Sequence, residues 1–127
     1  MKNCRVNITS VVDGRKVDSV RMGKIEILPN LVKLWYEEEQ AIVELCLEDK
    51  KVTINRTGDY TLRLAFEKGQ ICDGTLGISG SKGDLQTETT RLAYSVADTS
   101  FMLSLHYQLL IGGEAQTTRL RLFAKIN

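Results

Sequence analysis

The chain has 127 residues, the usual size of one domain, and 43% of them are hydrophobic, which suffices for a core without a metal or a disulfide framework. Its 17 basic and 16 acidic residues give a net charge of +1, so no overall charge attracts it to nucleic acid or to an anionic membrane. The chain lacks both the apolar segment of a signal peptide and an apolar run of about 18 residues. We expect one domain over residues 1–127, a cytoplasmic location and no membrane partner, while the oligomeric state stays open.

Hydrophobic residues recur at every second position along most of the chain, which is the alternation of half-buried strands rather than of helices. The runs, in chain order, are Val6/Ile8, Ile25/Ile27, Val43/Leu45/Leu47, Leu62/Leu64/Phe66, Phe101/Leu103/Leu105 and Leu120/Leu122/Ala124. Turn sequences separate the strands at Asp13-Gly14, Pro29-Asn30, Asp49-Lys50, Gly58-Asp59, Lys68-Gly69, residues 77–83, Asp98-Thr99 and Gly112-Gly113. They predict ten strands, one of which ends near Gln40, and we interpret the run Glu37-Glu38-Glu39 as a solvated loop.

Two-residue turns determine which residues lie opposite one another, and so test whether the hydrophobic side chains share one face. The pairs predicted in this way are Ile25 with Leu34, Ile27 with Val32, Leu45 with Ile54, Leu47 with Val52, Tyr94 with Leu103, Val96 with Phe101 and Leu105 with Leu120. Around Gly58 we prefer the three-residue turn Thr57-Gly58-Asp59, which sets Ile54 opposite Leu62 and gives Gly58 a positive φ. One consistent inner face favours an all-β fold, a single closed antiparallel up-and-down barrel of about ten strands, with a β-sandwich as the alternative.

The same alternation gives the barrel two different ends. The turns near residues 14, 38, 58, 80 and 112 share one end in an up-and-down barrel. The inward side chains expected near that end are polar or aromatic: Tyr36, Arg56, Tyr60, Thr87, Thr89 and Tyr107. The inward side chains expected at the other end are apolar: Ile27, Val32, Leu47, Val52, Phe66, Val96 and Phe101.

Two functions from different classes fit this arrangement. In the first, the protein is a non-enzymatic binder whose small apolar or anionic ligand contacts Arg56, Tyr36, Tyr60, Tyr107 and Thr89 at the barrel mouth. Arginine suits a carboxylate or phosphate there. In the second, Arg56 only caps the barrel end by bonding carbonyls and tyrosine hydroxyls. The fully packed barrel is then a structural or protein–protein interaction module, with the outward Trp35 and Phe123 as anchors.

The residue types that carry catalysis are poorly placed. His106, the only histidine, is expected on the outer face near Arg119 and Arg121, away from any second metal ligand and from any serine that it could activate. Cys4, Cys46 and Cys72 lie far apart in sequence and are expected to be reduced structural thiols. We therefore expect no catalytic residues, no enzymatic activity, no metal and no cofactor.

Two weaker features complete the sequence-based expectations. The glycine-rich segment 74–83 lacks the GxxxxGK[ST] pattern and a following helix, so it predicts bulges and a flexible hairpin rather than a phosphate loop. Arg63, Arg119 and Arg121, with outward Trp35 and Phe123, are a candidate stripe for single-stranded nucleic acid. The balanced net charge disfavours nucleic acid as a partner.

The sequence resembles the YwiB-like family of small bacterial proteins over nearly its whole length. Arg56-Thr57-Gly58 is similar to the family's R-S-G turn, and Phe66-Glu67-Lys68-Gly69 to its F-x-x-G. Ser81-Lys82-Gly83-Asp84-Leu85 and Thr89 are similar to its P-[YF]-G-x-L stretch and the threonine that follows, although Lys82 stands where the family tends to carry an aromatic residue. The resemblance implies a calycin- or lipocalin-like barrel, a domain of unknown function, that binds a small apolar ligand.

Overall fold

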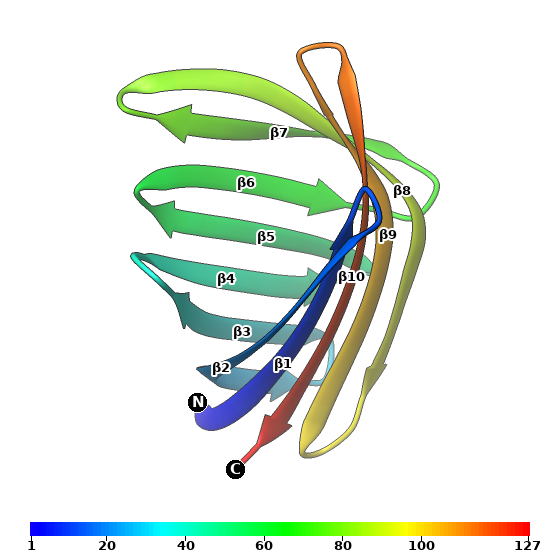
Figure 1. Cartoon of the computed structure of the whole chain (residues 1–127). Coiled ribbons are helices and arrows are strands. Elements are labelled where there is room, and N and C mark those ends of the chain that lie inside the picture. Colours follow the sequence, from blue (N-terminus) through cyan, green and yellow to red (C-terminus); the bar gives the residue numbers. More distant parts are fainter.

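Every segment of the chain between its short turns is a β-strand, and the computed structural model describes all residues from 1 to 127 (Figure 1). The strands are β1 (Lys2–Val12), β2 (Arg15–Leu28), β3 (Leu31–Glu38), β4 (Ala41–Glu48), β5 (Lys51–Gly58), β6 (Tyr60–Phe66), β7 (Ile71–Ile78), β8 (Ser81–Val96), β9 (Ser100–Ile111) and β10 (Glu114–Ile126). Each strand pairs with the next, and β1 pairs with β10, so the sheet closes into an antiparallel barrel. The predicted ten-strand barrel is therefore confirmed, and the β-sandwich is wrong. No helix of the structure is long and apolar enough to cross a membrane.

The barrel is flattened, and two long strands form its corners. In Figure 1, β3 to β7 cross the view while β1, β9 and β10 run steeply, with both chain termini side by side at the bottom. The strand β2 pairs with β1 up to Ile25 and with β3 from Gly23, and β8 likewise passes from β7 to β9. A register shift between Thr89 and Arg91 accompanies the bend of β8, as bulges commonly do where a strand changes sheets.

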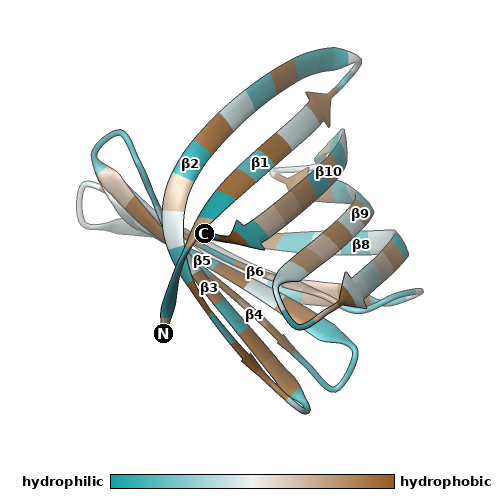
Figure 2. Cartoon of the chain, turned by 90° about the horizontal axis from the view of Figure 1, so that it is seen from below, coloured by the Kyte–Doolittle hydropathy of each residue, from teal (hydrophilic) through white to brown (hydrophobic).

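The inward side chains of all the strands meet in one hydrophobic core. The alternation of hydrophobic and hydrophilic residues along the strands is visible as colour bands in Figure 2. The largest fully buried side chains are Ile25, Leu34, Leu45, Phe66, Phe101, Leu103, Leu105 and Leu122. Each such side chain contributes roughly 1.5–3 kcal/mol relative to an exposed one. The core therefore holds the barrel together without a disulfide, and all three cysteines are free.

The pairings predicted from two-residue turns are confirmed. Ile27 faces Val32, Leu47 faces Val52 and Leu105 faces Leu120, and the remaining predicted pairs also lie opposite one another. At Asp49-Lys50 and Gly112-Gly113 both turn residues have positive φ, the geometry that matches the twist of the flanking strands. The register of these hairpins is therefore determined locally, because it depends only on the length of the turn.

The hairpin around Gly58 differs from the prediction. Ile54 faces Leu64 rather than Leu62, and Leu62 faces Arg56, so the register is shifted by two residues and every side chain keeps its expected face. Gly58 does not have positive φ; it belongs to β5 and lies opposite Ala41. A Cβ at Gly58 would collide with the Gln40 carbonyl oxygen and lie 2.8 Å from the Ala41 Cβ. The glycine is needed for close approach to β4, not for the turn.

The glycine-rich segment also departs from expectation. The ladder between β7 and β8 runs from Ile71 to Ile78 without a register shift and closes at the two-residue turn Ser79-Gly80, so the predicted bulges are absent from it. At Gly74 a Cβ would meet the Arg63 carbonyl oxygen and lie 2.7 Å from Leu85 Cδ1. Close packing across three strands therefore accounts for Gly74.

Gly23, at the corner in β2, offers a test of this close packing. A Cβ there would collide with the Trp35 carbonyl oxygen and lie 3.1 Å from the Tyr36 Cβ, whereas one at Gly83 would have its nearest neighbour at 4.0 Å. We expect Gly23→Ala to lower the free energy of unfolding by about 1–3 kcal/mol in urea denaturation. The control Gly83→Ala should leave stability unchanged or raise it by up to about 1 kcal/mol. Equal effects of the two substitutions would contradict this account of the corner.

Candidate functional site

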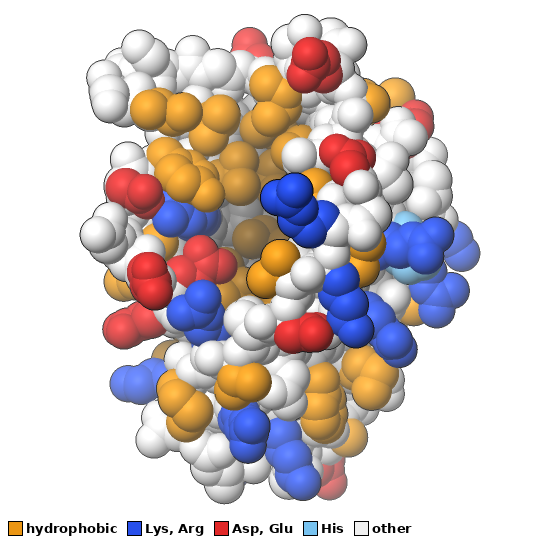
Figure 3. Space-filling view, viewed as in Figure 1, with side chains coloured by type: hydrophobic (Ala, Val, Ile, Leu, Met, Phe, Trp, Pro, Cys, Tyr) orange, Lys and Arg blue, Asp and Glu red, His pale blue; other side chains and the backbone are white.

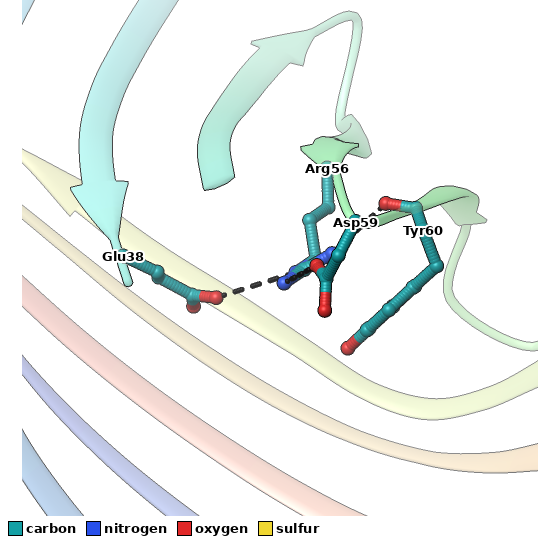
Figure 4. A network of polar contacts seen from close by, with 4 residues as sticks. All are labelled: Glu38, Arg56, Asp59 and Tyr60. Atoms are coloured by element: carbon teal, nitrogen blue, oxygen red, sulfur yellow. Dashed lines mark hydrogen bonds and ion pairs between the residues drawn. The ribbon is translucent and has the colours of Figure 1, made fainter. Parts of the chain in front are cut away.

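Arg56 lies at the barrel mouth, where it joins three strands. Its Nη2 donates to Asp59 Oδ1 at 2.8 Å, its Nη1 donates to the Tyr60 carbonyl oxygen at 2.9 Å, and its Nε contacts Glu38 Oε2 at 3.4 Å (Figure 4). The guanidinium also stacks on the Tyr60 ring, with Cζ 3.7 Å from the ring centroid. Only 11% of the Arg56 side chain is exposed. We call these four residues the Arg56 cluster.

Sequence reasoning found Arg56 and Tyr60 but missed the two carboxylates. Glu37-Glu38-Glu39 was interpreted as a solvated loop, yet Glu37 and Glu38 belong to β3, and the Glu38 side chain turns towards Arg56. The inward alternation of Val32, Leu34 and Tyr36 continues to Glu38, so the period-two signal was present in the sequence. Asp59 had no such signal, because it lies in the turn between β5 and β6.

The charges of the Arg56 cluster stabilise one another. Burial acts to lower the pKa of Arg56, but the hydrogen bond to Asp59, the Tyr60 phenol and the contact with Glu38 outweigh it, so the pKa is raised. The hydrogen bond from Arg56 lowers the pKa of Asp59. One cation therefore faces two carboxylates, which makes the cluster's formal charge negative rather than positive. Arg56 is already engaged before any anionic ligand arrives.

A double-mutant cycle tests the contact between Arg56 and Glu38. We expect Arg56→Gln and Glu38→Gln to be coupled in the free energy of unfolding, on the order of 0.5 kcal/mol because both groups keep some contact with water. The exposed pair of Lys16 and Asp18, whose side chains are 64% and 65% exposed, provides the control and should show almost no coupling. Equal coupling free energies in the two pairs would contradict the interpretation that the contact with Glu38 holds Arg56 in place.

Tyr36 and Tyr107 lie in the barrel interior. Both side chains contact the core, and the Tyr107 ring lies 4.6 Å from the Phe66 ring. Burial, aided by the nearby Glu38 carboxylate, raises the pKa of Tyr36, and burial also raises that of Tyr107. Both phenols therefore stay protonated, and the Tyr107 phenol is hydrogen-bonded with the buried Thr118 on β10.

Two buried threonines on β8 behave differently. The Thr87 hydroxyl donates to the Ala65 carbonyl oxygen, at a point where β6 and β7 have separated and no longer share backbone hydrogen bonds. The Thr89 hydroxyl is equally buried, with 1% of the residue exposed, and has no hydrogen-bond partner in the protein. Thr89 lies opposite Tyr107 on β9. A buried hydroxyl without a partner costs about 1–3 kcal/mol, which a ligand group that hydrogen-bonded to Thr89 would recover.

The mouth is also more apolar than predicted. Three aliphatic residues on the inward alternation, each beside a hairpin tip, remain strongly exposed: Val17 at 57%, Ile78 at 52% and Ile111 at 40%. Figure 3 shows a hollow in the face of the barrel, with hydrophobic side chains in its depth and charged side chains at its rim. Because these inward hydrophobic residues remain exposed to solvent, the barrel is open at this end.

The opposite end of the barrel is apolar, as predicted. Val52, Phe66 and Phe101 are fully buried there. A cavity of about 310 Å³ lies at this end, and Val32, Leu47, Tyr94 and Val96 are among its lining residues. Tyr94 thus lies at this end of the barrel, apart from Arg56.

A groove on the outer surface had no counterpart in the sequence analysis. It has a volume of about 1180 Å³ and lies between the outer faces of β5 to β8 and the tip of the β9–β10 hairpin. Arg63 and the carboxylates Asp73, Asp84 and Glu114 are among its lining residues. The structure brings together no set of three histidine, cysteine, aspartate or glutamate side chains that could hold a metal ion. The groove is lined by outward-facing polar residues, so it is a surface feature separate from the barrel mouth.

His106 lies on the outer face of β9, as predicted, directly between Arg91 on β8 and Arg119 on β10. Its partial burial and the charges of Arg119, Arg91 and Arg121 lower its pKa. Arg63 and Trp35 lie on other strands, β6 and β3, so the stripe considered from the sequence is divided between separate faces.

The lowered pKa of His106 makes stability depend on pH. The unfolded chain, with a histidine pKa of about 6.5, takes up a proton before the folded chain does, so stability is complete above that pKa and is lost as the pH falls below it. We expect the urea midpoint to fall between about pH 7.5 and 5.5, and His106→Gln to remove most of that slope. Because the chain has one histidine, its NMR titration reports this pKa directly. A folded-state pKa at or above the ordinary value would contradict the prediction.

Comparisons with known proteins agree with the barrel and add no activity. None of the curated proteins matches the sequence. The crystal structure of the ywiB protein from Bacillus subtilis has a TM-score of 0.86 to this chain at 16% sequence identity, covering 99% of this chain and 92% of that one. At this identity the likeness shows a shared fold alone. A family model described as a domain of unknown function, DUF1934, matches residues 5–122. The chain therefore belongs to the DUF1934 family.

Proposed function

We propose that this protein is a non-enzymatic carrier or sensor that binds a small, mainly apolar molecule through the open mouth of the barrel. The observations that carry the proposal are the exposed inward aliphatic residues at the mouth and the unpartnered Thr89 hydroxyl in the barrel interior. Such a site, apolar with a few converging polar groups, is how small-ligand sites in calycin-like barrels are generally built.

The apolar side chains at the mouth supply the driving force. Val17, Ile78 and Ile111 each keep two-fifths or more of their surface in contact with water. An apolar ligand would cover them and gain about 25 cal/mol for each Å² removed from water. A polar ligand would leave this surface wet.

The state of Arg56 favours an apolar ligand over an anionic one. Asp59 and Glu38 already occupy its guanidinium, and the Tyr60 ring covers one face of it. A carboxylate or phosphate would have to displace these partners and approach two like charges. A neutral hydroxyl or carbonyl group would instead pair with Thr89 or with the phenol of Tyr36.

Binding without chemistry is the simplest role for these residues. The mouth offers a guanidinium, two carboxylates, phenols and hydroxyls, while the only histidine lies on the outer face. Both carboxylates, Glu38 and Asp59, are paired with Arg56, and neither is hydrogen-bonded to a hydroxyl or thiol that it could activate as a nucleophile. The alternative, a packed barrel that acts as a structural or interaction module, is the outcome if no ligand binds.

The test uses one fluorescent probe and two competitors of equal chain length. N-phenyl-1-naphthylamine is neutral and fluoresces when it enters an apolar site. We expect it to bind, and tetradecanol to displace it at lower concentration than myristate, since the two have the same chain length and differ in the head group, a neutral hydroxyl against a carboxylate. No probe binding, or no displacement by either competitor, would leave the packed barrel as the better description.

Thr89→Val is the decisive variant. It should weaken tetradecanol binding about five-fold, the value of one hydrogen bond of about 1 kcal/mol, while raising the stability of the ligand-free protein because it removes an unpartnered hydroxyl. Thr61→Val, at an exposed position of β6, is the control and should change neither quantity. A variant of Thr89 that loses stability without losing affinity would contradict a role for this hydroxyl in binding.

A further inference from the structure

The balanced net charge conceals a strongly basic region on the outer face of the barrel. We call it the basic strip, and its members are Arg5, Arg91, His106, Arg119, Arg121 and Lys125. In Figure 3 the histidine lies among lysine and arginine side chains at the right-hand side of the molecule. The strip spans β1, β8, β9 and β10, so strands from both ends of the chain build it.

The cross-strand register brings like charges together within the strip. Arg91, His106 and Arg119 form one row across three strands, and Lys125 lies directly opposite Arg5. Like charges opposite one another in a sheet, as Lys125 and Arg5 are, destabilise it. This repulsion would be relieved by an anion that binds to the strip.

No carboxylate within the protein neutralises the strip. The ion pairs of the structure involve Lys16, Lys51 and Arg56, none of which belongs to it. Of the acidic residues that border it, Asp18 accepts a hydrogen bond from Thr9 and pairs with Lys16. The other, Glu88, lies further along β8 and pairs with no cation. The five arginine and lysine side chains are exposed and free to bind.

Apolar side chains interrupt the strip at one place. Phe123 projects outward between Arg121 and Lys125, and Met102 lies directly opposite it with 49% of its surface exposed. The span from Arg119 to Lys125 is roughly 20 Å at the usual rise of a strand. Cations that follow a line, with an aromatic ring among them, match the requirements of a polymer whose phosphates and flat bases alternate.

From these observations we propose that the basic strip binds single-stranded nucleic acid, with Arg91, Arg119 and Arg121 on phosphates and Phe123 against a base. Planar guanidinium groups bind phosphate through two parallel hydrogen bonds. An open sheet face accepts splayed-out bases, as sheet-based RNA-binding domains do, and it has no helix to enter a major groove. An acidic protein surface would satisfy the charges but would not use the ring.

Fluorescence anisotropy with a labelled twelve-nucleotide oligouridylate tests the proposal. We expect binding in 50 mM salt, and at least a ten-fold loss of affinity in the triple variant Arg91→Gln, Arg119→Gln and Arg121→Gln. The slope of log affinity against log salt concentration should fall by about 2, since each phosphate contact on a single strand contributes about 0.7. The control removes three cations that lie outside the strip, on β3 and in two turns, Lys33→Gln, Lys50→Gln and Lys68→Gln, and should bind like the wild type.

Two further measurements separate nucleic acid from other anions and from misfolding. Phe123→Leu keeps an apolar contact but removes the ring, and should weaken binding several-fold without changing the salt slope. Poly-glutamate should compete poorly; equal competition would show a general anion surface and overturn the proposal. Absence of binding in 50 mM salt, or an equal loss in the control triple variant, would overturn it as well. Melting temperatures of both triple variants establish that they are folded.

Discussion

The pairing of β1 with β10 is the constraint on which the rest of this structure depends. It joins the two ends of the chain and removes the last open edges of the sheet, so every strand has two neighbours. Once the sheet is closed, each side chain points either into the barrel or away from it. The inward set forms the core and the mouth, and the outward set forms the basic strip and the polar groove.

Closure also explains the unusual state of Arg56. Its position on β5 follows Val52 and Ile54 on the inward alternation, so the backbone directs a charged group into an apolar barrel. Burial of a lone charge would be costly, and the structure offsets it with carboxylates from β3 and the neighbouring turn and with the Tyr60 ring. Arg56 thus caps one side of the mouth, while the exposed aliphatic residues leave another side open.

The outer face shows why net charge is a poor guide to interaction surfaces. The net charge of +1 shows that acidic and basic residues are nearly equal in number, but it does not show where they lie on the surface. Strands β10 and β1 are distant in sequence but adjacent in the barrel, which places Lys125 opposite Arg5. Electrostatic interactions act over about 10 Å, so this local arrangement decides what the face attracts.

The sequence by itself determined the ten strands, the inward and outward sets of residues, and the register of each two-residue hairpin. These properties follow from alternation and turn length, which are local. Tertiary structure alone decided the partners of Arg56, the shifted register between Arg56 and Leu62, the close approaches that require Gly23 and Gly74, and the unpartnered hydroxyl of Thr89. Each of these depends on which atoms of a neighbouring strand lie within a few ångströms. The alternation of residues along the sequence does not determine these distances between strands.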